Sequence, residues 1–186
     1  MPDLRARLVE VGVDLVTREG TGALSLREIA RRAGVSHGAP RRYFPTHLSL
    51  LAAIAAEGYR GLAARIAALE PHAPPRARVT ALARLYLDFA RGNRGMFELM
   101  FRHEVLRGND VGLRETSRPL FRVLVDLVAA ARPDVARPAV VAGALWANLH
   151  GIAQLGQWGS LQMVLDSDDL EPLLDAAVTA HLGGSS

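Results

Sequence analysis

The segment from Ser25 to Phe44 constrains the fold of this 186-residue chain more than any other. It reads SLREIARRAGVSHGAPRRYF. Ser25 followed by Glu28 is the pattern of a capping box, which begins a helix by satisfying amide donors at both ends of its first turn. Gly34 then suits a left-handed helix end, and Ser36 suits the start of another short helix. The segment therefore predicts two short helices that meet across a tight Gly-Val-Ser turn.

Helical spacing continues through the rest of the chain, where apolar residues recur every three or four positions and no strand-like alternation of any length is found. The proline-rich stretch 71–75 is the best candidate for a linker. We predict an all-α protein, with a three-helix head, a larger C-terminal helical bundle and about nine helices in all. The predicted helices cover about residues 4–20, 25–34, 36–43, 46–70, 79–89, 96–101, 113–131, 138–159 and 170–182, with residues 108–112 as a loop.

The composition excludes several classes of protein. The chain is 49% hydrophobic, which is enough for a packed core and argues against wholesale disorder. No run of about twenty uncharged apolar residues occurs, so no transmembrane helix and no membrane association are expected. The first residues lack the apolar core of a signal peptide. Cysteine is absent, which removes disulfides and thiolate metal sites and agrees with a cytoplasmic location.

The net charge of +3 lies entirely in the first quarter of the chain. Residues 1–47 carry eight arginines against five acidic residues, and the remainder carries fourteen of each. A basic end of this kind is what a phosphate-binding head needs, although an excess of this size could also arise by chance.

The second short helix of the head carries the side chains that DNA recognition requires. Arg41 and Arg42 can pair with phosphates or with guanine edges, and Gly38 lets the backbone approach a groove. Ser36 and Thr46 each begin a helix, where free amides and the helix dipole favour a phosphate. The alternative is a tight helical hairpin whose arginines are simply solvated.

The turn and its flanks resemble the TetR family of transcriptional repressors. The resemblance spans some thirty positions, and the matching residues within this span are Gly20 to Leu26, Ile29-Ala30, Ala33-Gly34-Val35-Ser36, Gly38, Tyr43-Phe44 and Leu50-Leu51. It implies a DNA-binding head in residues 1–47 and a ligand-binding and dimerisation domain in residues 48–186. It also implies a homodimer on a palindromic operator in double-stranded DNA, released by a small-molecule effector.

Three residues of the head depart from the family's usual pattern. Pro40 lies inside the reading helix, Arg41 stands where an aromatic residue is common, and His47 stands where lysine is usual. Histidine titrates near neutrality, so His47 should bind phosphate more weakly than lysine and with more pH dependence. The residues expected at the DNA are Ser25, Arg27, Ser36, His37, Gly38, Arg41, Arg42, Tyr43, Thr46 and His47.

The C-terminal region resembles one TetR subgroup through Trp146, three further residues, and then His150-Gly151. In the family the last two helices pair with their copies to form the dimer interface. Methionine and aromatic side chains suit an adaptable cavity for a mostly apolar molecule, although a stripe of such residues is more often plain core. The candidate ligand-binding residues are Met96, Phe97, Met100, Phe101, Phe121, Leu124, Trp146, His150 and Trp158.

The same region shows no catalytic motif, and we expect no enzyme activity and no cofactor. Asp166, Asp168 and Asp169 cluster without the rest of a calcium loop, so no metal site is expected.

Two other hypotheses stay open. One is a small all-helical enzyme that uses aspartate and histidine. The other is a helical protein-interaction module with a degenerate DNA-binding head, which the departures at Arg41 and His47 permit.

Overall fold

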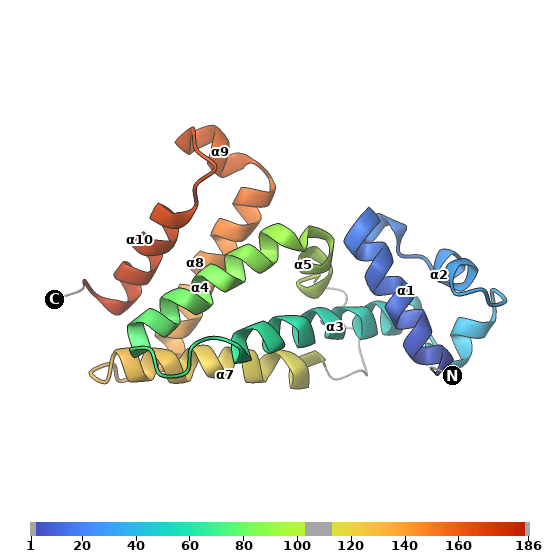
Figure 1. Ribbon diagram of the computed structural model, residues 1–186, viewed down its shortest axis with the longest axis horizontal. Helices are drawn as coiled ribbons and strands as arrows, with labels where there is room; N and C mark the ends of the chain where they lie inside the picture. Colours follow the sequence, from blue (N-terminus) through green and yellow to red (C-terminus); the bar gives the residue numbers. More distant parts are fainter. Residues whose placement is uncertain (1–2, 103–112, 185–186) are drawn as a thin grey trace. The chain divides into compact units, whose positions relative to one another are not determined.

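The computed structural model describes residues 3–102 and 113–184, and all its regular elements in these residues are helical (Figure 1). Nine α-helices and two short 3-10 helices are found there. The chain divides into two compact units. Unit 1 consists of Met1–Gly61 and Asn93–Ser117, and unit 2 of Leu62–Gly92 and Arg118–Ser186.

Unit 1 begins with three helical segments packed around a small apolar core. Its elements are α1 (Leu4–Glu19), η1 (Thr21–Ala23), α2 (Leu26–Arg32), η2 (Ala39–Arg42), the first part of α3 (His47–Ala67), α5 (Arg94–Met100) and the start of α7 (Leu113–Ala131). Leu8, Ile29 and Ile54 are completely buried. A Cβ atom at Gly12 would overlap the side chain of Ile54, so glycine is what allows α1 to lie this close to α3.

The short helix α5 is part of the same unit as the head. A Cβ atom at Gly95 would overlap the carbonyl oxygen of Val16 in α1. The Thr21 hydroxyl donates to the Glu98 carboxylate at 2.8 Å. The buried hydroxyl of Tyr59 in α3 donates to the carbonyl oxygen of Met100 at 2.8 Å. These contacts hold α5 against both α1 and α3.

Unit 2 contains the remaining helices. They are the end of α3, α4 (Pro75–Gly92), most of α7, α8 (Pro138–Gln157), α9 (Ser160–Leu165) and α10 (Glu171–Leu182). Helices α4, α8 and α10 each contact the other two, and Figure 1 shows them side by side. Leu145, Leu149 and Leu174 are buried between them. Among the described residues no helix is both long and apolar enough to cross a membrane.

Most of the predicted helices are confirmed, and their ends follow the predicted caps. Gly34 has the left-handed φ of +65° that was expected after α2. Pro138 occupies the first turn of α8, where its missing amide leaves no helical bond unmade. The predicted linker at residues 71–75 contains no helix before Pro75, where α4 begins. The predicted loop at 108–112 lies outside the described residues.

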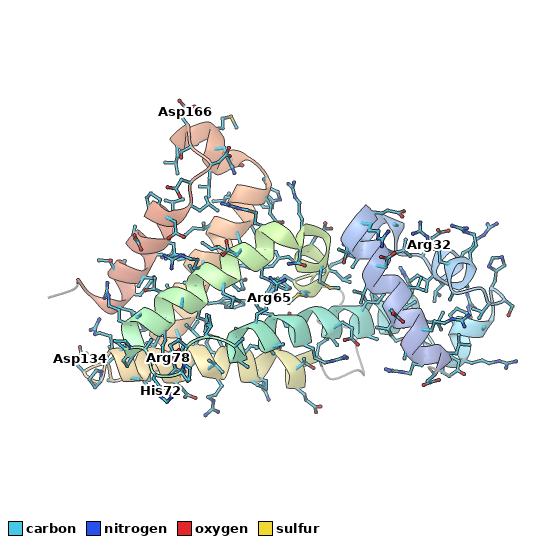
Figure 2. All side chains as sticks on the ribbon, viewed as in Figure 1. Arg32, Arg65, His72, Arg78, Asp134 and Asp166 are labelled. Carbon is cyan, nitrogen blue, oxygen red and sulfur yellow. The ribbon has the colours of Figure 1, made fainter. Side chains whose placement is uncertain are left out.

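Two predictions about helices are wrong. The helix expected at residues 36–43 is a single 3-10 turn, η2, and the 20-residue helix α8 is followed by a separate helix, α9, that was not predicted. Gly159, with a φ of +75°, separates α8 from α9, and Asp166, with a φ of 50°, ends α9. Figure 2 labels Asp166 at this end of α9. The count of nine α-helices within the described residues agrees with the prediction, although the members differ.

The capping box at the start of α2 is only half formed. The Ser25 hydroxyl accepts the Glu28 amide at 3.1 Å, as predicted. The amide of Ser25, however, donates to the Ala23 carbonyl rather than to Glu28. The Glu28 carboxylate binds Arg31 and Arg32 instead, because charge-assisted bonds to two guanidinium groups are stronger than a bond to one neutral amide.

Candidate functional site

Two arginines of the head are neutralised by a carboxylate network. Arg31 lies 2.6 Å and Arg32 2.7 Å from the same Glu28 oxygen, and Arg32 also lies 2.6 Å from Glu19. Figure 2 labels Arg32, the last residue of α2. Hydrogen bonds from Arg31 and then from Arg32 lower the pKa of Glu28 to about 2. Glu28 is therefore ionised near neutral pH, and these two arginines already have partners.

Three further arginines of the head are also engaged within it. The Arg5 guanidinium lies over the Phe44 ring, 5.3 Å from its centroid. Arg7 donates to the carbonyl oxygen of Ala33 just before the turn. Arg18 pairs with Asp14 at 2.6 Å. Each of these side chains supports the packing or charge balance of the head.

The other three of the eight arginines in the head are Arg27, Arg41 and Arg42. All three are exposed, and within the described residues none of them forms an ion pair. Arg27 projects from α2, and Arg41 and Arg42 belong to η2. The unpaired positive charge of the head therefore lies on the two segments that the helix-turn-helix pattern assigns to DNA.

Pro40 explains why η2 is a 3-10 turn. Proline has no amide to bond four residues back to the Ser36 carbonyl, and the Ala39 amide takes that carbonyl at 3.0 Å instead. The turn begins at Gly38, with no side-chain cap. The prediction that Ser36 caps this element is therefore wrong, although Ser36 itself is exposed in the preceding turn.

The start of α3 is the third segment of the head, besides α2 and η2, that carries residues nominated for DNA contact. Thr46 and Ser49 exchange two bonds, the Ser49 amide to the Thr46 hydroxyl at 3.0 Å and the Thr46 amide to the Ser49 hydroxyl at 3.2 Å. The predicted cap at Thr46 is confirmed. His47 Nε2 lies 2.8 Å from the Leu24 carbonyl oxygen and must donate to it, since a carbonyl only accepts. His47 thus ties α3 to the chain just before α2, a contact that the sequence did not indicate.

All ten residues nominated for DNA contact are exposed in unit 1. They are Ser25, Arg27, Ser36, His37, Gly38, Arg41, Arg42, Tyr43, Thr46 and His47. Phe44, Leu24 and Pro40 are buried beneath them. The surface therefore combines exposed polar and basic side chains with a rigid apolar support.

The nominated ligand-binding residues fall into both units. Met96, Phe97 and Met100 are buried in unit 1, on α5, and Phe101 is half-buried beside them. A Cβ atom at Gly58 would lie 2.6 Å from the Met100 sulfur, so the methionines fill space that this glycine leaves. The Phe97 and Phe101 ring centroids lie 4.8 Å apart. In unit 1 these side chains pack as core.

In unit 2 a second group of nominated residues meets where α4, α7 and α8 come together. The indole Nε1 of Trp146 donates to the Tyr86 hydroxyl at 3.3 Å, and that hydroxyl lies 2.8 Å from His150 Nδ1. Phe121 packs edge-on against Trp146, with 6.3 Å between the ring centroids. Phe121 and Trp146 are 38% and 39% exposed. We call Tyr86, Phe121, Trp146 and His150 the aromatic corner.

Tyr86 is the residue of this corner that sequence reasoning missed. Its spacing in the sequence is that of an apolar position of its helix, and 60 residues or more separate it from Trp146 and His150. The remaining two nominated residues are apart from the corner's hydrogen bonds. Leu124 is buried on α7, and Trp158 is 70% exposed after the end of α8.

A small polar cleft of about 70 Å³ lies between α4 and α10. It is lined by Arg84, Leu87, Asp88, Arg91, Asp169, Leu170, Glu171 and Leu174, none of which was nominated. Arg84 binds Glu171 across it through two bonds of 2.7 and 2.6 Å. Asp169 accepts the Glu171 amide at 3.0 Å at the start of α10. Asp169 therefore supports the start of α10, and Glu171 pairs with Arg84.

Comparison with known protein families identifies the family to which this chain belongs. Residues 8–54 match the family model described as bacterial regulatory proteins, tetR family. Residues 79–181, more than half of the chain, match the model described as tetracyclin repressor-like, C-terminal domain. The chain belongs to the TetR family. This TetR-family protein is therefore a DNA-binding transcriptional regulator with a helix-turn-helix head and a ligand-binding type of C-terminal domain.

Solved structures agree with the assignment. A protein of unknown function from Rhodococcus sp. RHA1 is 30% identical, with 98% of this chain and 95% of that chain covered and a TM-score of 0.81. The multidrug binding protein EbrR, in complex with ethidium, is 25% identical, with 98% and 100% covered and a TM-score of 0.68. EbrR in complex with imidazole is 26% identical, with 100% and 98% covered and a TM-score of 0.62. No curated protein matches the chain.

Proposed function

We propose that this TetR-family regulator is a homodimeric repressor that leaves a palindromic operator when a small, mostly apolar molecule binds. The observation that carries the proposal is the distribution of charge in the head. Five of the eight arginines are engaged internally, and the three that form no ion pair with any described residue are exposed on α2 and η2. The mechanism requires contact with the chromosome and therefore a cytoplasmic location, and it requires no catalytic step.

The proposed DNA contacts follow from the exposed surface of unit 1. Arg41 and Arg42 on η2 are assigned to base edges or nearby phosphates, and Arg27 on α2 to a phosphate. Thr46 lies at the start of the 21-residue helix α3, where the helix dipole favours a phosphate. His47 is assigned mainly to holding α3 in place through Leu24, so its contribution to phosphate binding is secondary.

The proposed effector site includes the aromatic corner. Phe121 and Trp146 expose flat apolar surface, and the hydroxyl of Tyr86 and the imidazole of His150 supply polar atoms among them. A few polar groups in an apolar surrounding are typical of small-molecule sites. The complexes of EbrR with ethidium and imidazole support a site for small aromatic molecules in this fold. The Trp146, His150 and Gly151 pattern also supports membership of the Trp-His-Gly subgroup.

The proposed dimer interface uses α8 and α10. No residue from Pro138 to Gly159 is charged, although Val140, Leu155 and Trp158 are 53%, 40% and 70% exposed. An uncharged helix with so much exposed apolar surface is expected to have a partner. A second copy fits, because a two-fold dimer presents two heads to half-sites about 34–36 Å apart, or a multiple of this distance.

Selection of bound DNA from a random pool tests the function directly. We expect enrichment of an inverted repeat, followed by a mobility shift with that repeat whose affinity falls as salt rises. A scrambled repeat of the same length is the control. Failure to enrich any sequence would overturn the proposal and favour the protein-interaction module instead.

The effector part of the proposal has a separate test. Ethidium is a suitable probe for binding to the protein without DNA, and we expect it to bind; because it also intercalates into duplex DNA, release of the operator is measured with molecules that do not intercalate. A panel of small apolar and aromatic molecules extends the search to uncharged compounds. If none of these probes lowers operator affinity, the proposed induction by small apolar molecules is wrong, while the DNA-binding result stands.

A further inference from the structure

The hydroxyl of Tyr86 lies at the centre of the aromatic corner and joins two elements of unit 2. It comes from α4, and Trp146 and His150, which it contacts, come from successive turns of α8. The distances are 3.3 Å from the Trp146 Nε1 and 2.8 Å from the His150 Nδ1. The Trp146 and His150 ring centroids are 5.9 Å apart. The three side chains therefore form one hydrogen-bonded group.

The chemistry of the three groups fixes the direction of one bond and favours one direction for the other. An indole N–H only donates, so the Tyr86 oxygen accepts from Trp146. A phenol O–H is a stronger donor than an imidazole N–H, and an unprotonated imidazole nitrogen is a stronger acceptor than a phenol oxygen. These relative strengths favour a bond in which the Tyr86 hydroxyl donates to an unprotonated His150 Nδ1. In neutral histidine the proton then lies on Nε2.

We propose that Tyr86 is a positioning residue of the effector site, which holds His150 as the neutral Nε2–H tautomer and orients the Trp146 indole beside it. The role in effector binding rests on the function proposed above, whereas the tautomer and the orientation can be tested without any effector. A neutral imidazole keeps the corner uncharged, so it suits flat apolar molecules that lie against Trp146 and Phe121. A protonated imidazole would place a positive charge directly beside the indole.

The surroundings of His150 support the neutral form. On its own helix, no residue from Pro138 to Gln157 is charged. Among the described contacts from α4, Tyr86 is a titratable group that faces it, while Arg84 pairs with Glu171 and Arg91 donates to the Asp168 carbonyl. From α10, His181 binds Asn148 rather than His150. From α7, Phe121 packs edge-on against the Trp146 ring. Burial among these groups lowers the pKa of His150.

Fluorescence of Trp146 provides the first test, because the chain has two tryptophans. In a Trp158→Phe protein Trp146 is the single reporter, and protonated imidazole quenches a neighbouring indole. We expect its emission to titrate with a midpoint below the ordinary histidine value of about 6.5. Adding His150→Gln should abolish the titration. Retention of the same midpoint without His150 would overturn the proposal.

The Tyr86→Phe substitution, in the same single-tryptophan protein, removes only the hydroxyl. We expect the midpoint of the Trp146 emission to move to higher pH, because the bond that stabilises the unprotonated Nδ1 is lost. Tyr59→Phe is the matched control, since it removes another buried tyrosine hydroxyl, that of unit 1, and should leave the midpoint unchanged. A midpoint that is unchanged, or lower, in Tyr86→Phe would overturn the proposal.

Nitrogen NMR of the histidine rings gives a readout that a merely structural tyrosine would not move. In the unsubstituted protein at neutral pH, we expect His150 Nδ1 to have the shift of an unprotonated nitrogen and Nε2 that of a protonated one. In Tyr86→Phe we expect both nitrogens to move toward averaged values. An Nδ1–H tautomer in the unsubstituted protein would overturn the proposal. These measurements use the protein without effector, so they fail or succeed independently of the ethidium test.

Discussion

Gly95 in α5 lies against the carbonyl oxygen of Val16 in α1, so closely that a Cβ atom would overlap it. The same Cβ atom would lie 3.0 Å from the Cα of Gly20. Both neighbours are backbone atoms, which cannot move aside as a flexible side chain can. This contact fixes how α5 packs on the end of the first head helix.

Gly95→Ala should therefore destabilise the protein, although alanine is the better helix former. Overpacking of a tight contact costs about 1–3 kcal/mol, which exceeds the gain of about 1 kcal/mol in helix propensity. Urea unfolding of the two proteins measures the difference. Gly61→Ala in α3 is the control, because a Cβ atom there meets nothing within 4 Å and the substitution should be neutral or stabilising. Equal effects of the two substitutions would show that the close contact is not rigid.

Removal of the exposed arginines should weaken operator binding selectively. Arg41→Ala and Arg42→Ala are each expected to cost about 1–3 kcal/mol if the side chain reads a base. A phosphate role would instead lower the slope of log affinity against log salt by about one per contact and leave base preference unchanged. Mobility shifts at several salt concentrations distinguish the two roles. Arg60→Ala, which loses a side chain already paired with Glu57, should bind as the unsubstituted protein does. Unchanged binding in both η2 variants would mean that this turn does not read the operator.

Tyr59→Phe should destabilise unit 1 because it leaves the buried Met100 carbonyl without its hydroxyl donor. An unsatisfied buried acceptor costs about 1–3 kcal/mol. Burial also raises the pKa of Tyr59 to about 12, so this bond is expected to be lost by ionisation only as the pH rises through about 12. Tyr43→Phe, at an exposed tyrosine, is the matched control for the unfolding measurement and should have little effect. A Tyr59→Phe protein as stable as the control would indicate that another donor replaces the hydroxyl.

Glu28 should titrate with a pKa of about 2, compared with an ordinary value of 4.5, as followed by carbon NMR of its carboxylate. Arg31→Ala should raise this pKa toward the ordinary value, since the hydrogen bond from Arg31 is the largest cause of the shift. Because the folded-state pKa is lowered, the contribution of the network to stability is fully present above about pH 4.5. It is lost as pH falls through about 2. Arg18→Ala, which removes the partner of Asp14, should leave the Glu28 titration unchanged. A Glu28 midpoint near 4.5 in the unsubstituted protein would contradict the network.

Ala147→Glu should convert the proposed dimer into monomers, because it places a charge on the exposed, uncharged face of α8. Burial of an unpaired carboxylate in an interface costs several kcal/mol. Sedimentation velocity gives the mass in solution. Ala64→Glu, an exposed alanine of α3, is the control and should not change the mass. A dimer that survives Ala147→Glu would place the interface elsewhere.

The sequence by itself determined the features that depend on neighbouring residues. Helix ends at Gly34, Thr46 and Pro138 were predictable because caps and backbone restrictions act within a few positions of the chain. The spacing of apolar residues gave the all-helical class for the same reason. The ten nominated DNA contacts are all exposed, since the helix-turn-helix frame fixes which faces of its helices are buried.

Tertiary structure decided the pairings between residues far apart in the chain. Nothing local indicates that His47 binds the Leu24 carbonyl, or which five arginines of the head are engaged with other described residues. In the sequence, Tyr86 has the spacing of an ordinary apolar position of α4. Only the fold brings its hydroxyl to 2.8 Å from Nδ1 of His150, which is 64 residues away. Periodicity gives the buried face of a helix but not its neighbours. Which polar atoms meet there depends on how helices from distant segments pack together.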